Sequence, residues 1–239
     1  MKKINHFIDG NEYLGQSKRS GDVYNPALGE KIAEVSFANS DDVEQAIISA
    51  KNVFSSWSKT PPLTRSRIFF KFKELLVRDM DKLAAQVTEE HGKVLSDSIG
   101  SITRGMEVVE FMCGVPHLIK GEFSENVGSN IDSWSMRQPL GICVGITPFN
   151  FPAMVPMWMF VVAIACGNCF ILKPSEKDPS LLILLGDLLK EAGLPDGVFN
   201  VVNGDKEAVD CLITHPEVSA VSFVGSTPIA EYIYHTSSQ

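Results

Sequence analysis

The stretch GICVGITPFNFPAMVPMWMFVVAIACGNCFILKPSE, residues 141–176, decides the fold. It begins with an apolar strand over 142–146, continues through a proline-bracketed turn at 147–152, and then enters an apolar helix over 153–166. A second apolar strand follows over 169–172. Strand, helix and strand in this order predict a βαβ unit, whose two strands lie parallel in one sheet.

Polar side chains follow both strands of this unit. Thr147 and Asn150 come after the first strand, and Lys173 and Glu176 come after the second. Ligands of parallel α/β sheets bind just beyond the carboxyl ends of the strands. We therefore expect these four residues at one binding edge.

The sequence before this unit predicts strands followed by helices. Residues 1–39 are predicted to be irregular or β-rich, and three amphipathic helices follow. A capping pair of Asp41 and Glu44 is expected to open the first helix. The second helix carries an unbroken apolar stripe over 68–87, and the third begins after Gly92.

Polar alternation around Gly128 predicts a β-hairpin over 121–138 that leaves the main body. Such an excursion is typical of an oligomerisation arm, and an ordinary surface flap has the same pattern. Helices and strands then alternate again after residue 176, with helices over 179–192, 206–214 and from 228, and strands over 197–202 and 220–224. Four strands separated by helices predict an α/β fold with a Rossmann-like, doubly wound parallel sheet.

Composition and charge exclude several classes of function. The chain of 239 residues is 44% hydrophobic, enough for a sizeable core, and its formal net charge of −8 comes with no basic stripe. We therefore expect no nucleic-acid partner and no membrane surface. The apolar segment 151–172 is interrupted by Pro152, Pro156 and Gly167, so it predicts a helix buried on all sides and not a membrane span. Five cysteines without paired spacing, and no signal peptide, favour a cytoplasmic protein with reduced thiols.

Lys173 and Glu176 form the sharpest candidate site. Both follow a buried strand directly, and Pro174 stiffens the connection between them. A lysine and a carboxylate together suit the vicinal hydroxyls of a ribose, and Glu176 would repel a 2′-phosphate, which favours NAD over NADP. The alternative is a surface ion pair, which contributes ~0–1 kcal/mol and needs no position at a strand end.

Two further polar positions allow both a structural and a functional interpretation. Asn150 lies among two phenylalanines and two prolines, and its amide either bonds backbone carbonyls or donates to a developing oxyanion. Gly225 and Ser226 follow a predicted strand, where the serine either caps the next helix or meets a pyrophosphate. The motif is short, so the cap is the default interpretation.

Arg104, the cysteines and the histidines show no site pattern of their own. Arg104 lies off the main stripe of its helix, on a face with Val108, Phe111 and Val115. Its guanidinium either reaches water or waits for a carboxylate, and the spacing favours the first. The five cysteines are predicted to be structural, and the five histidines lack metal-ligand spacing, so no metal site is expected.

Three ordered motifs resemble the aldehyde dehydrogenase superfamily. They are ITPFNFP at 146–152, ILKPSE at 171–176 and FVGST at 223–227, and GLPDGVFNVVNG at 193–204 extends the resemblance over nearly the whole chain. All match the N-terminal half of that superfamily. The segments RQPLGICVGITPFNFPAMVPMWMF and TRGMEVVE are similar to its CoA-acylating methylmalonate-semialdehyde dehydrogenases.

The resemblance implies a mechanism and a role for each site residue. A cysteine thiolate attacks the aldehyde, hydride passes to NAD, and the thioacyl-enzyme transfers its acyl group to coenzyme A, which releases propionyl-CoA or acetyl-CoA. Asn150 becomes the oxyanion donor, and Arg104 becomes the clamp for a carboxylate on the aldehyde. The implied cofactor residues are Thr147 and Phe149 at the nicotinamide, Lys173, Glu176 and Lys177 at the adenine ribose, and Gly225 and Ser226 at the pyrophosphate.

The resemblance also implies limits. None of the five cysteines occupies the nucleophile motif of the family, and the chain stops soon after a ligand-site pattern, so we expect a truncated form that lacks the catalytic domain and is inactive alone. Its parts are expected to be an N-terminal helical part of the NAD-binding domain over 1–120, the arm over 121–138 and the NAD-binding core over 139–239. The full-length form is expected to be a homo-oligomer, a dimer or tetramer. Two alternatives remain, which are a non-catalytic NAD-binding or oligomerisation module and a hydrolytic aldehyde dehydrogenase of another substrate.

Overall fold

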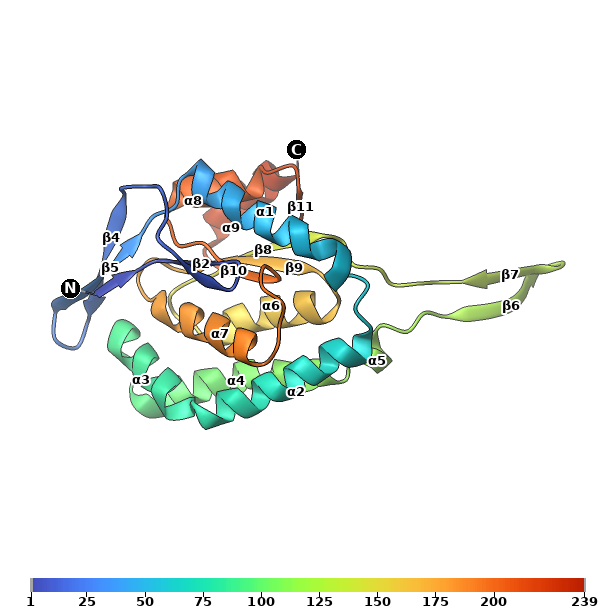
Figure 1. Cartoon of the computed structure of the whole chain (residues 1–239), viewed down its shortest axis with the longest axis horizontal. Coiled ribbons are helices and arrows are strands. Elements are labelled where there is room, and N and C mark those ends of the chain that lie inside the picture. The colour runs from blue at the N-terminus through green and yellow to red at the C-terminus, as the bar shows by residue number, and fades with distance from the viewer. Residues whose placement is uncertain (1, 239) are drawn as a thin grey trace.

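Four of the six strands of the main sheet are parallel to one another and adjacent, as the sequence predicts (Figure 1). The computed structural model describes residues 2–238, and its sheet runs in the order β11 (Val218–Phe223), β8 (Ile142–Ile146), β9 (Cys169–Lys173) and β10 (Phe199–Val201). β8 and β9 are buried along their whole length. Strands that are covered on both faces read as continuous apolar runs, which is why the sequence identifies these two so clearly.

N-terminal strands extend the main sheet and form a second one. The antiparallel strands β2 (His6–Ile8) and β3 (Asn11–Tyr13) follow β10, and β1 (Lys2–Ile4), β5 (Glu30–Ser36) and β4 (Ser20–Asn25) form a separate sheet. The β-rich prediction for this region is confirmed. At the opposite edge, β11 pairs with β8 alone among the described strands.

Helices cover both faces of the sheet. They are α1 (Ser40–Trp57), α2 (Pro62–Arg78), α3 (Met80–His91), α4 (Leu95–Cys113), α5 (Val115–Leu118), α6 (Met154–Ala165), α7 (Ser180–Glu191), α8 (Lys206–Ile213) and α9 (Thr227–Ser237). Figure 1 shows α1, α8 and α9 over one face and α6 and α7 over the other, with α2, α3 and α4 as an outer layer. This arrangement confirms the doubly wound α/β fold.

The position of α6 explains its apolar sequence. The helix lies between the sheet and α4, and a Cβ atom at Gly105 of α4 would stand 2.2 Å from the Met157 methyl group of α6. The two helices are therefore in close contact. The prediction that α6 is buried on all sides is wrong for one stripe, because Trp158 and Val162 are exposed. Within residues 2–238, no helix has the length and apolar character needed to cross a membrane.

The expected single helix over 68–87 is two helices, and the break lies at Asp79. This residue leaves helical geometry at φ −102° and ψ 13°, and its carboxylate accepts from Arg78 Nε at 2.7 Å. The buried Leu76 before the break and the buried Leu83 after it both face the core. The apolar stripe therefore passes the break without a change of phase, and periodicity gives no sign of it.

The start of α1 differs from the expected Asp41 and Glu44 pair. Asn39 is the cap residue, and its side-chain oxygen accepts the Asp42 N–H at 3.0 Å while the Asp42 carboxylate accepts the Asn39 N–H at 3.2 Å. An asparagine side chain accepts at this position as well as a serine does. The reciprocal pair therefore lies two residues before the predicted one.

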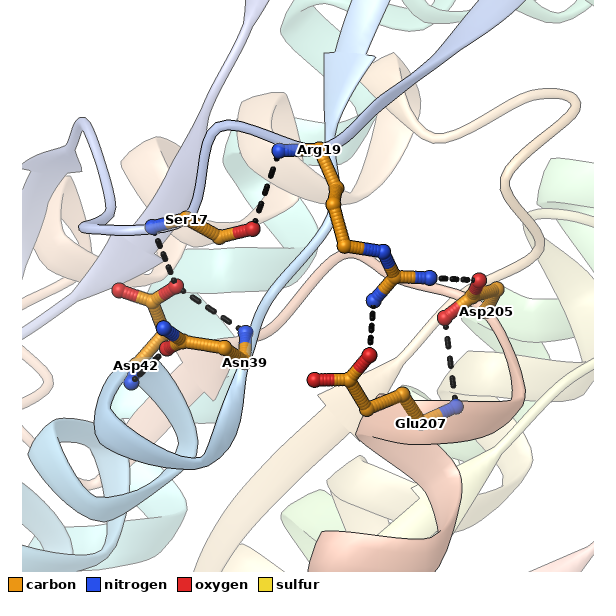
Figure 2. Close-up of polar contacts among 6 residues, drawn as sticks. All are labelled: Ser17, Arg19, Asn39, Asp42, Asp205 and Glu207. Atoms are coloured by element: carbon orange, nitrogen blue, oxygen red, sulfur yellow. Dashed lines mark hydrogen bonds and ion pairs between the residues drawn. The ribbon is translucent and has the colours of Figure 1, made fainter.

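Figure 2 shows how this cap is tied to distant parts of the chain. The Asp42 carboxylate also accepts the Ser17 N–H at 3.3 Å. From the same N-terminal segment, the Arg19 guanidinium pairs with both Asp205 and Glu207 at the start of α8. The segment before β4 thus fastens the first turns of α1 and α8, which lie on one face of the sheet.

The predicted hairpin projects far from the body (Figure 1). It consists of β6 (Phe123–Gly128) and β7 (Ile131–Trp134), and Phe123 is opposite Trp134. Asn130 has a positive φ of 62° in the turn, a conformation that asparagine tolerates better than most residues. The side chains of both strands are largely exposed, so the arm adds little to the core of this chain.

Candidate functional site

The carboxyl ends of three parallel strands meet at one edge and place the predicted residues there. The Thr147 N–H, just after β8, donates to the Lys173 carbonyl at the end of β9 at 3.2 Å. The Val224 N–H, just after β11, donates to the Ile146 carbonyl at 3.2 Å. The segments that carry Thr147, Lys173 and Ser226 are therefore neighbours; the βαβ pattern predicts this for Thr147 and Lys173, and the parallel sheet brings Ser226 to the same edge.

Lys173 and Glu176 approach one another at this edge. Lys173 Nζ lies 3.5 Å from Glu176 Oε2, and the two side chains are 8% and 41% exposed. Burial lowers the pKa of Lys173, and the attraction of Glu176 opposes that shift. The interpretation as a surface ion pair is wrong for the lysine, because its side chain is buried and only its partner reaches solvent.

Phe149 and Lys177 form a second contact beside the first. Lys177 Nζ lies 4.6 Å from the centre of the Phe149 ring, and the His91 ring centre lies 6.3 Å from the same ring. Phe149 and Lys177 are exposed, whereas Thr147 is buried. The turn after β8 and the segment after β9 thus form one continuous surface.

A cavity of about 520 Å³ opens on this surface. Its lining includes Glu90, His91, Phe149, Glu176, Lys177 and Asp178. Sequence reasoning missed Glu90, His91 and Asp178. Glu90 and His91 end α3 and resemble an ordinary solvated helix end in sequence, and only the fold brings them to the strand edge.

Asn150 and Ser226 lie free at the same edge of the sheet. The Asn150 side chain is exposed, and within residues 2–238 no hydrogen bond holds it, so the bond to backbone carbonyls is not made. Ser226 is the cap residue of α9, but its hydroxyl makes no capping hydrogen bond. The default interpretation of Ser226 as a side-chain cap is wrong. Both polar groups are open to a ligand.

Comparison with known proteins identifies the family. The sequence profile of the Aldehyde dehydrogenase family matches residues 13–239. This chain belongs to that family. A malonate-semialdehyde dehydrogenase of Pseudomonas aeruginosa is 54% identical over 234 residues, which are 98% of this chain and 47% of the relative.

Solved structures of the family have the same fold as this chain. A Sinorhizobium meliloti protein named as a methylmalonate-semialdehyde dehydrogenase and solved with NAD has a TM-score of 0.98 and 55% identity, over 100% of this chain and 48% of its own. The methylmalonate-semialdehyde dehydrogenase of Oceanimonas doudoroffii has a TM-score of 0.97 and 57% identity, over 100% and 49%. The chain spans about half the length of the curated relatives it matches.

Arg104 lies in the middle of α4. Its side chain is exposed, and among the described residues no carboxylate pairs with it. Phe111, on the predicted face, is exposed too. Val115 does not continue that face, because α4 ends at Cys113 and Val115 begins the buried turn of α5. In this structure the Arg104 guanidinium therefore reaches solvent.

The five cysteines of this chain are free thiols. Burial raises the pKa of Cys143 to about 11 and that of Cys169 to about 12, and it raises the pKa of the other three as well. A raised pKa reduces the thiolate fraction at neutral pH. This agrees with the prediction that they are structural. No metal-ligand cluster occurs among residues 2–238.

Asp178, which lines the cavity, is expected to make the stability of the protein depend on pH. Burial and repulsion from Glu90 raise its pKa to about 8, and both carboxylate oxygens lack a hydrogen-bond partner in the described chain. An unfolded aspartate ionises near ~4, so the folded protein keeps a proton that the unfolded chain loses, and stability falls as the pH rises between these values. Asp178→Asn should remove this penalty and stabilise the protein by about 4 kcal/mol more at pH ~8.5 than at pH ~5.

Urea unfolding at both pH values measures the effect. The matched control is Asp81→Asn, at an exposed position in the first turn of α3. Equal pH slopes for the Asp178 and Asp81 variants would contradict the assignment of a protonated Asp178.

Proposed function

We propose that this chain is the NAD-binding part of an enzyme that oxidises malonate or methylmalonate semialdehyde and acylates coenzyme A. The observation that carries the proposal is the meeting of Lys173, Glu176 and the uncapped Ser226 at one sheet edge. The names of the relatives support the substrate class. When bound, NAD accepts hydride from the oxidised carbon.

The residues present fit an adenine dinucleotide. The Lys173 ammonium and the Glu176 carboxylate offer a donor and an acceptor to the two ribose hydroxyls. The Ser226 hydroxyl and the Thr227 N–H at the start of α9 suit the pyrophosphate, because a helix start carries a partial positive charge; the next residue, Pro228, has no N–H. Thr147 and Phe149 line the nicotinamide side, Lys177 stands beside the ribose, and Gly225 allows the backbone to come close.

Asn150 and Arg104 are proposed to act on the substrate. The free Asn150 amide donates to the oxyanion that develops when a thiolate adds to the aldehyde, and one such donor is worth ~3 kcal/mol in the barrier. Arg104 holds the carboxylate of the semialdehyde through its planar fork of N–H groups. The hairpin over 121–138 is proposed to join copies into a homo-oligomer, since its exposed apolar side chains include Phe123 and Trp134.

We do not propose that a cysteine of this chain supplies the nucleophilic thiolate. All five of its thiols have a raised pKa, so we propose that this polypeptide alone binds NAD without turning over an aldehyde. Five free thiols also suit a reducing compartment, and we propose the cytoplasm.

Calorimetric titration with NAD tests the proposal. We expect saturable binding by this polypeptide and about tenfold weaker binding by Lys173→Met, which removes the buried donor at similar side-chain length. The matched control is Lys71→Met, at an exposed position of α2.

Two results would overturn the proposal. Absence of NAD binding would remove the cofactor site. NADH formation by this polypeptide from malonate semialdehyde and coenzyme A would show that one of the five cysteines is the nucleophile.

A further inference from the structure

A second cavity, of about 620 Å³, lies at the other end of the sheet. It is lined by the start of α2, the end of α6 and residues 136–140, which connect the hairpin to β8. Leu140 precedes β8 and Asn168 precedes β9, whereas Thr147 and Lys173 stand at the opposite ends of these strands. A five-residue strand is about 16 Å long, so the cavity is separate from the candidate NAD site.

The cavity contains a buried guanidinium without a counter-ion. Arg65, in the first turn of α2, is only 3% exposed. Its Nε and Nη1 atoms are buried and have no hydrogen-bond partner within the described chain. An arginine stays protonated, and a buried charge without a partner costs several kcal/mol. The described residues supply neither a counter-ion nor an acceptor to these two atoms.

The residues next to this guanidinium leave space for it and hold the adjacent wall of the cavity in place. Gly167 has a φ of +96°, and a Cβ atom there would lie 2.2 Å from Arg65 Nη1, so only glycine leaves room for the arginine. The Asn168 side-chain oxygen accepts the N–H groups of Leu140 at 2.6 Å and Gly141 at 3.2 Å. These bonds fix the wall formed by the segment before β8.

The remaining charges around the cavity are also positive. Lys59 and Arg137 line it, no acidic residue does, and neither cation pairs with a carboxylate within residues 2–238. The start of the 17-residue helix α2 lies at the same place and has no side-chain cap. Pro62 has no N–H, and the Thr64 and Arg65 N–H groups donate to the Pro61 carbonyl, so the helix start contributes its partial positive charge and not a row of free donors. This charge and the positive charge of the guanidinium both favour a bound oxyanion.

We propose that this cavity binds the phosphate group of a small molecule. The phosphate is held by Arg65 at the base and by Arg137 and Lys59 at the mouth. The volume exceeds what a single phosphate needs and lies within the range of small-molecule pockets, so the organic part of the ligand has room beside it. The site is independent of the proposed NAD site.

Titration with inorganic phosphate, followed by phosphorus NMR at constant ionic strength, tests the proposal. We expect saturable binding that is unchanged by saturating NAD. Arg137→Gln, at an exposed position, should weaken the binding about tenfold, which is about 1.4 kcal/mol. Arg65→Lys keeps a positive charge but removes the planar guanidinium that lines the cavity, and it should weaken binding by a similar factor. The matched control is Arg67→Gln, which is exposed on the same helix outside the cavity and should bind like the unaltered chain.

A parallel titration with malonate separates phosphate from carboxylate ligands. Tighter binding of phosphate, lost in the Arg137 variant and kept in the Arg67 variant, supports the proposal. Tighter binding of malonate, displacement of phosphate by NAD, equal binding by both variants, or no saturable binding overturns it.

Discussion

Phe160→Ala is expected to lower the free energy of unfolding by roughly 3–5 kcal/mol. Phe160 of α6 is fully buried, and its ring centre lies 4.8 Å from Phe199, 6.4 Å from Phe72 and 6.5 Å from Phe170. These partners come from β10, α2 and β9, so this side chain joins the sheet to two helical layers. Removal of the ring leaves a cavity that three separate elements surround and cannot easily close.

The measurement is urea unfolding followed by tryptophan fluorescence, to which the buried Trp57 contributes together with the exposed Trp134 and Trp158. Phe70→Ala on α2 is the matched control, because Phe70 is 55% exposed and its truncation should cost less than ~1 kcal/mol. A loss below ~1 kcal/mol for Phe160→Ala would show that the layers are not joined through this ring.

Glu176→Gln is expected to shift the preference between NAD and NADP about thirtyfold toward NADP. The 2′-phosphate of NADP would lie against the Glu176 carboxylate, and two like charges at close range repel by about 1–2 kcal/mol near a protein surface, where partial exposure screens them. The amide removes that repulsion and leaves Lys173 free to attract the phosphate. Binding of NAD should weaken a few-fold, because the amide is a poorer acceptor for ribose hydroxyls.

Calorimetric titration of both dinucleotides gives the ratio of dissociation constants. Glu125→Gln on the hairpin is the control, since it makes the same change of charge far from the strand edge. An unchanged ratio in the Glu176 variant would place the adenine ribose elsewhere, even if NAD still binds.

The central part of the fold is predictable from the sequence because its strands are covered on both faces. β8 and β9 appear as unbroken apolar runs, and the helix between them has no polar face. The strands β2 and β3 have three residues each, too few for a periodic pattern, so their place in the main sheet emerges only from the structure. The break at Asp79 was hidden for a related reason, since the apolar stripe keeps its phase.

Some residues of the candidate site are predictable from the sequence, and others are not. Lys173 and Glu176 are predictable because each follows a strand directly, and strand ends of a parallel sheet share one edge. Asp178 and Glu90 are 88 residues apart in the chain, and only the tertiary fold brings them to one cavity. The exposure of Asn150 was not predictable from its apolar neighbours, since a turn rich in proline and phenylalanine can still lie at the surface.

β11 lies at the edge of the main sheet, and this position favours self-association of the polypeptide in solution. Amide and carbonyl groups along its outer side form a ready template for a strand from another molecule, since no strand within residues 2–238 occupies that side. Self-association through such a border grows with concentration. Keeping the protein dilute, and adding early in purification a molecule that binds this outer side of β11, should therefore favour recovery of monodisperse protein.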